Sequence, residues 1–174
     1  MKNTINFLAA GVLALSTAAV FAQSSGPNDA QIAAIVVAAN TVDINAGKQA
    51  LSMSHNKEVK DFAQRMITDH TGVNNQAVAL VTKLHVTPED NPTSKSLQDD
   101  GAKTLARLKE LKGASFDKAY VDNEVTYHQA VLDAVDKTLL PNASNAELKD
   151  LLIKVRPAFV AHLEHAKEMQ STMK

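Results

Sequence analysis

Residues 57–84 read KEVKDFAQRMITDHTGVNNQAVALVTKL, and their apolar side chains recur every three or four positions. The recurring positions are Val59, Phe62, Met66, His70, Val73, Ala77, Leu80 and Leu84. Such spacing gathers the side chains into one stripe along an α-helix, which buries that stripe against other elements. His70 is the polar member of the stripe. The segment therefore predicts a long amphipathic helix with a histidine on its buried face.

Four further segments show the same helical spacing. They span residues 29–53, 95–111, 116–139 and 145–172. No stretch has the strict alternation of a β-strand. Four apolar stripes bury one another when four helices close around one core. We therefore expect residues 23–174 to form a single all-α domain. It is a four-helix bundle with one additional short helix in the connection between the second and third long helices.

Local signals set the expected ends of these helices. The expected N-caps are Asn28, Ser115 and Ser144, because their side chains can accept a hydrogen bond from the first turn. Gly113 is expected to stop the short helix. Pro157 lies inside the last segment and leaves one backbone carbonyl without its donor, so we expect a kink there.

Residues 1–22 have the features of a secretory signal peptide. Lys2 supplies the positive charge, residues 5–21 are apolar or small, and a polar stretch begins at Gln23. The alternative is an uncleaved membrane anchor, but the apolar run is shorter than a full membrane span. We therefore expect cleavage before Gln23 and export to the periplasm or cell envelope.

Composition excludes several classes of function. The chain has no Cys, so neither thiolate chemistry nor a lipid-bearing cysteine is available. Without Lys2 it keeps 18 − 1 = 17 basic residues against 19 acidic ones, with no basic stripe for nucleic acid. Trp is absent and aromatic residues are few, which argues against a platform for stacking sugars or bases. After the leader we expect no transmembrane segment.

Acidic and histidine side chains interrupt the apolar stripe of every long helix. They are Asp43, His70, Glu124, His128, His162 and His165. A buried carboxylate is costly unless it is paired or bound to a cation. Imidazole and carboxylate together suit zinc, copper or iron, and bundles build such sites from inward-pointing side chains on facing helices. These six residues are the candidate metal ligands, and no catalytic residue or organic cofactor is indicated.

Helical rise gives the expected heights of these side chains along the bundle. If the chain turns near residues 54–55, Asp43 is offset from His70 by ~6 Å. If it turns again near residue 142, His162 is level with Glu124 and ~9 Å from His128. Glu124 and His162 are therefore expected to be the easiest pair to bring together across helices.

Three functions remain open. The first is a binding protein that holds a transition metal in metal homeostasis or stress defence. The second is a structural or interaction bundle, in which pairs such as Asp43–His70 and Glu124–His162 only fix helix packing. The third is a metal-dependent redox enzyme. It ranks last because the ligand set looks incomplete and the sequence indicates no substrate pocket.

Three segments resemble signatures of a bacterial family catalogued as domain of unknown function 4142. They are residues 59–66 followed by Asp69 and His70, residues 116–120 followed by His128, and Pro157 followed by His162 and Leu163. Members of that family are often labelled putative outer-membrane or exported proteins. The family is grouped with ferritin-like bundles, so the resemblance implies a ferritin-like fold. It implies no established activity.

The chain departs from the family pattern and from ferritin-type iron sites. The family usually carries Glu near the place of Asp43, and the shorter acid reaches less far. Neither His128 nor His162 has a Glu three residues before it. The Glu-x-x-His pairs of di-iron bundles are therefore missing, and a di-iron oxidase or iron-storage cage is not indicated.

Overall fold

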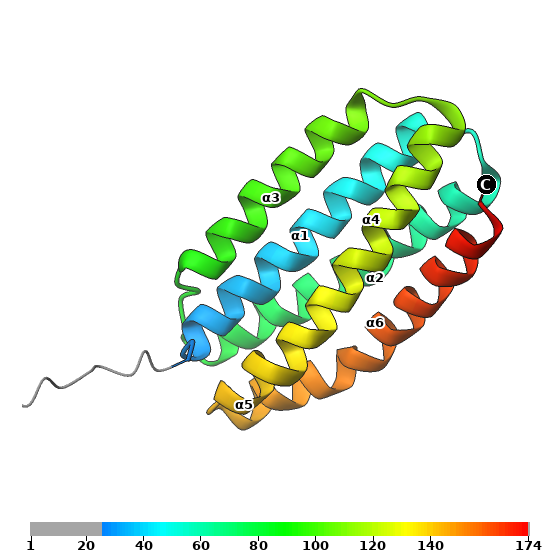
Figure 1. Cartoon of the computed structure of the whole chain (residues 1–174). Helices are drawn as coiled ribbons and strands as arrows, with labels where there is room; N and C mark the ends of the chain where they lie inside the picture. Colours follow the sequence, from blue (N-terminus) through cyan, green and yellow to red (C-terminus); the bar gives the residue numbers. More distant parts are fainter. Residues whose placement is uncertain (1–25, 174) are drawn as a thin grey trace, which may run out of the picture.

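A computed structural model describes residues 26–173, and every regular element in this range is helical (Figure 1). The elements are α1 (Asp29–Met53), α2 (Lys57–Lys83), α3 (Pro92–Lys109), α4 (Gly113–Ala134), the π-helix η1 (Val135–Leu139), α5 (Leu140–Asn142) and α6 (Ala146–Thr172). The all-α prediction is confirmed. The predicted leader, residues 1–22, lies outside the described residues.

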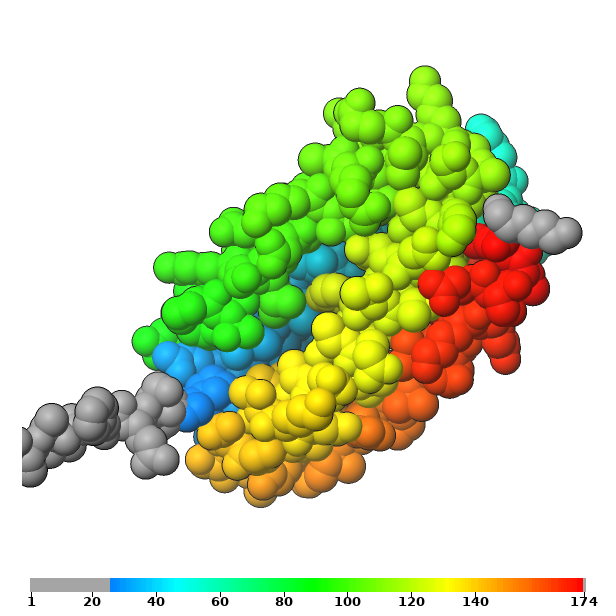
Figure 2. All heavy atoms as spheres, in the orientation of Figure 1, coloured from blue at the N-terminus to red at the C-terminus, as the bar shows by residue number. Residues whose placement is uncertain are grey.

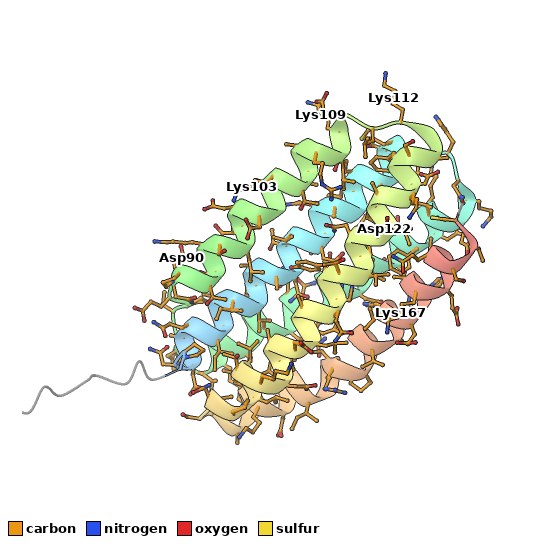
Figure 3. All side chains as sticks on the ribbon, in the orientation of Figure 1. Asp90, Lys103, Lys109, Lys112, Asp122 and Lys167 are labelled. Carbon is orange, nitrogen blue, oxygen red and sulfur yellow. The ribbon has the colours of Figure 1, made fainter. Side chains whose placement is uncertain are left out.

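The long helices run side by side along the bundle. α1 packs most extensively on α2, and α4 on α6, each pair being antiparallel (Figure 1). α3 lies against the outside of α1 and scarcely touches α4. Gly101 permits the close approach of α3, since a Cβ there would lie 2.8 Å from Val42 Cγ2. Charged side chains such as Lys103 and Lys109 point away from the helices (Figure 3).

The apolar core is divided into two clusters along the bundle. One contains Ile35, Leu132 and Phe159, and the other contains Phe62 and Phe116. On all four long helices the buried residues pass from one cluster to the other. At each crossing a polar or charged side chain occupies the buried face. The acids and histidines of the sequence stripes therefore form a layer between two apolar halves.

Asparagine caps most of the helices. The N-caps of α1, α2, α3 and α6 are Asn28, Asn56, Asn91 and Asn145. The prediction for Asn28 is confirmed by its bond with the backbone N–H of Gln31, at 2.9 Å. The prediction for Ser144 is wrong. The neighbouring Asn145 accepts instead from the backbone N–H of Leu148, at 3.1 Å.

The junction between α3 and α4 differs from the predicted one. α3 ends at Lys109, and α4 begins at Gly113 rather than after Ser115. Lys112 is the N-cap and makes no side-chain hydrogen bond, so the predicted cap at Ser115 is wrong. Gly113 has φ +54°, a conformation that glycine adopts without a steric cost. Gly113 therefore begins the next helix instead of ending the short one.

The end of α4 is wider than a regular α-helix. Residues 135–139 form the π-helix η1, and the helical path continues through α5 as far as Asn142. Single π-turns inside helices occur often at functional sites. The sequence did not indicate this feature. α6 is helical on both sides of Pro157, and the kink at that residue stays a prediction.

α1 is long and apolar enough to cross a bilayer by length and composition alone. The expectation that no transmembrane segment follows the leader stays a prediction. Within the bundle, however, α1 packs against α2, α3 and α4, and 56 % of its most apolar window is buried. A helix covered by neighbours on several sides is expected to be apolar on all of them.

Candidate metal centre

The polar layer between the two apolar clusters is buried. It contains Asn40 and Asp43 from α1, His70 from α2, Glu124 and His128 from α4, and His162 from α6. None of these six residues is more than 3 % exposed. Every long helix therefore contributes at least one polar side chain to one buried site, as bundle metal sites require.

Three imidazole rings form the centre of this layer. The ring centroids of His70, His128 and His162 lie 5.3–5.6 Å from one another. One ring nitrogen from each histidine lies within 4.8 Å of those of the other two. The three rings come from three different helices, so their convergence is a property of the tertiary fold.

Each imidazole is held by one of its two nitrogens. The contacts join His70 Nδ1 to Asn40 Oδ1 (2.6 Å), His128 Nδ1 to the Glu124 carbonyl oxygen (3.0 Å) and His162 Nε2 to Asp69 Oδ2 (2.8 Å). Asn40 donates its amide N–H to the Val36 carbonyl, so its Oδ1 accepts from His70. All three partners are acceptors, which places the ring proton on the held nitrogen. Metal-binding histidines are oriented in this way.

The opposite nitrogens of the three rings have no hydrogen-bond partner. They are His70 Nε2, His128 Nε2 and His162 Nδ1. Asp43 Oδ2 lies 3.0 Å from the first and 3.3 Å from the second. Both oxygens of Asp43 also lack a hydrogen-bond donor. Lone pairs therefore face one another in a buried space, which is unfavourable unless a proton or a cation lies between them.

Burial and the neighbouring groups shift the pKa values of the ionisable groups in this layer. Burial lowers the pKa of His128, and it lowers the pKa of His162 from 6.5 to about 4. Burial would raise the pKa of Asp43, but the neighbouring histidines, His70 first, hold it below its usual value. At neutral pH Asp43 is thus charged, while His128 and His162 are neutral ligands.

Glu124 differs from Asp43 in the direction of its pKa shift. Burial and the nearby charge of Asp43 raise the pKa of Glu124 well above its usual value. Its Oε2 lies 3.5 Å from His128 Nδ1. Asp43, Glu124 and His128 together offer a second group of ligand atoms within 4.8 Å of one another. Glu124 therefore lies beside the imidazoles as an acid with a raised pKa.

Some of the predicted pairs form and others do not. The Asp43–His70 contact is present at 3.0 Å. Glu124 and His162 do not form the expected pair: Glu124 contacts His128, and His162 contacts Asp69. His128, expected ~9 Å from His162 by helical rise, lies in the same group of rings.

His165 lies outside the centre. Its ring packs edge-on against Phe62 with the centroids 5.2 Å apart, in the other apolar cluster. A residue three positions after His162 is displaced by ~4.5 Å along the helix and rotated around it. That displacement carries His165 past the polar layer. Of the six candidate ligands, the structure brings together the other five.

Two residues that hold the histidines were missed. Asn40 lies one turn before Asp43 and belongs to the same buried face of α1. Asn40 is neither an acid nor a histidine, but its spacing from Asp43 places it on that face in the sequence. Asp69 precedes His70, so it points away from the stripe of α2 and is partly exposed. Only the packing of α6 against α2 shows that Asp69 reaches His162.

Comparison with known proteins identifies a family but no activity. A family model described as Domain of unknown function (DUF4142) matches residues 14–169. Searches of curated proteins and of solved structures found no match. The matched range contains all of the residues of the polar layer, and the resemblance predicted from the three sequence segments is confirmed.

Acidification is expected to destabilise the metal-free protein through His162. The pKa of His162 is about 4 in the folded chain against 6.5 for the unperturbed side chain. The unfolded state therefore binds more protons between these values, and stability is lost as the pH falls through them. His162→Gln removes this loss. As the pH falls from neutral to about 4, the wild type should lose about 2–3 kcal/mol of unfolding free energy that His162→Gln keeps.

Urea unfolding across this pH range, with a chelator present, measures the difference between variant and wild type. His165→Gln, on the same helix but outside the polar layer, is the control. A difference between His162→Gln and the wild type that stays constant with pH would contradict the assignment of His162 as a buried neutral imidazole.

Proposed function

Since the chain belongs to the family described as a domain of unknown function (DUF4142), we propose its function from the site itself. The protein binds one transition-metal ion through His70, His128, His162 and Asp43. The single observation behind this proposal is the set of three buried ring nitrogens without partners, whose opposite nitrogens are held by acceptors. A metal ion would satisfy all three, together with the Asp43 carboxylate.

The distances within the layer suit a single ion. Ligand atoms ~2.1 Å from a tetrahedral ion lie ~3.4 Å from one another. Asp43 Oδ2 is already 3.0 Å and 3.3 Å from two of the nitrogens. The three histidines need only a small inward rotation from their present separation of up to 4.8 Å. Three imidazoles and one carboxylate suit zinc, copper or iron.

The ligand set supports binding and sequestration of a single ion rather than chemistry at an iron pair. Four long helices that direct ligands inward are consistent with a ferritin-like bundle. Yet neither His128 nor His162 has the preceding Glu of a di-iron site. A buried mononuclear site of this kind fits a role in metal homeostasis or stress defence.

Structural stabilisation is the competing function. In that case the Asp43–His70 contact would be a proton-bridged pair that fixes the register of α1 against α2. It leaves His162 Nδ1 and His128 Nε2 unexplained, because both would remain buried without a donor or a cation. The metal site is therefore the better account of the same residues.

Metal titration tests the proposal directly. The protein, purified without a histidine tag, should bind about one equivalent of zinc, copper or iron with a Kd below about 1 μM, equivalent to ~8 kcal/mol or more. His128→Gln should weaken binding by about 100-fold or more, because it removes a ligand from the centre of the layer. His165→Gln, which leaves the layer intact, should bind as the wild type does.

Equal binding by both variants would place the metal elsewhere. Binding weaker than about 1 μM for all three metals would contradict the proposal. In that event a large loss of thermal stability in His128→Gln, with no change on adding metal, would favour the structural function.

We also propose that the protein acts in the periplasm or cell envelope. This proposal is supported by Lys2, the apolar run of residues 5–21 and the polar stretch that follows. The N-terminal sequence of the protein recovered from cell envelope and periplasmic fractions tests it, and Gln23 is the expected first residue. Recovery of the chain in the cytoplasm with residues 1–22 attached would contradict export.

A further inference from the structure

A cavity of about 400 Å³ reaches from the surface to the polar layer. It lies between α3 and α4, which scarcely touch, and α1 forms its floor. In the space-filling view, atoms of α1 are visible between those of α3 and α4 (Figure 2). Thr93, Thr126 and Ala130 are exposed at its rim, whereas His70 and His128 form part of its inner wall. Cavities of this volume hold small organic molecules.

The cavity wall is mostly apolar on the side of the histidines that faces η1. From His128 the wall continues along α4 and η1 through Val131, Val135 and Leu139. This stretch is ~16 Å long at the rise of an α-helix. Leu97 of α3 forms part of the wall as well. The cavity is thus an elongated apolar space with imidazoles at one point on its inner wall.

The π-helix contributes to this shape. A π-turn has a wider hydrogen-bonded ring than an α-turn, so side chains four residues apart lie more nearly on one face. Val135 and Leu139 are four apart, both are buried, and both line the cavity. η1 therefore extends the apolar wall away from His128.

We propose that this cavity binds a medium-chain fatty acid. Its unbranched apolar tail lies along Val131, Val135 and Leu139, and its carboxylate lies against His70 and His128. This inference rests on the proposed function, because the bound ion supplies the positive charge that the carboxylate needs. Without the ion, the unpartnered histidine nitrogens and the Asp43 carboxylate next to His70 would repel an anion.

Other classes of small molecule fit the wall less well. Sugars and nucleotides need several convergent polar groups, and a peptide needs partners for its backbone. The fully buried polar residues of the wall, Asn40, His70 and His128, lie together at its inner end. Its other polar residues are half-buried or exposed: Thr93, Asp100, Thr104, Asn123, Thr126 and Tyr127. The shape of the wall therefore matches a molecule with one polar head and one apolar tail.

Calorimetric titration of the whole protein with decanoate, and with decanol as its neutral counterpart, tests this inference. With metal bound, decanoate should bind at least about tenfold more tightly than to the metal-free protein, since the ion attracts its head group. Decanol should bind equally in both states. Octanoate should bind more weakly than decanoate by about fourfold for each missing methylene.

Two variants separate the cavity from other surfaces. Ala134→Phe places a ring in the cavity wall, and Ala130→Trp places one at the exposed rim, where folding is not at risk. Both should weaken decanoate binding by about tenfold or more and leave metal affinity unchanged. Ala161→Phe, exposed on α6 outside the cavity wall, is the matched control and should bind as the wild type does.

The two proposals fail in different ways. If metal binds but decanoate does not, or if Ala130→Trp and Ala134→Phe bind decanoate normally, the cavity inference is overturned and the metal site stands. Equal binding of decanoate with and without metal overturns the placement of the head group. If no metal binds, the proposed function fails, and the fatty-acid inference that rests on it is overturned as well.

Discussion

The structure depends on how a buried carboxylate, Asp43, is compensated. Its Oδ2 lies 3.0 Å from His70 Nε2 and 3.3 Å from His128 Nε2, inside a buried layer. Facing lone pairs in a medium of low polarity are unfavourable, and a cation between them removes the cost. The two apolar clusters enclose this layer from both ends of the bundle. The hydrogen bonds that His70 donates to Asn40 and His162 donates to Asp69 keep these two imidazoles turned toward the centre.

Much of the fold could be predicted from the sequence, because the apolar residues of each long helix recur every three or four positions. The bounds of α1 are those predicted, and every long helix was placed. The ends of the helices were predicted less accurately. Asn145 caps α6 instead of Ser144, because the side chain of either residue can accept a hydrogen bond from the first turn of a helix. η1 could not be foreseen, because a π-turn depends on packing that no single helix encodes.

The sequence predicted most residues of the candidate site, but not which of them contact one another. Reading polar residues on apolar stripes identified Asp43, His70 and His128, and their convergence is observed. Helical rise alone paired Glu124 with His162, because it ignores how each helix is rotated about its axis. The same omission placed His165 in the site. Asp69 was missed because its partner belongs to a helix 93 residues away in sequence.

Diffraction from crystals of the zinc-loaded protein, recorded on both sides of the zinc absorption edge, tests whether the polar layer binds the metal. One strong anomalous peak is expected between the helices. The peak should lie ~2.1 Å from one nitrogen each of His70, His128 and His162 and from an oxygen of Asp43. An empty polar layer with zinc bound only at exposed residues such as His55 would contradict it.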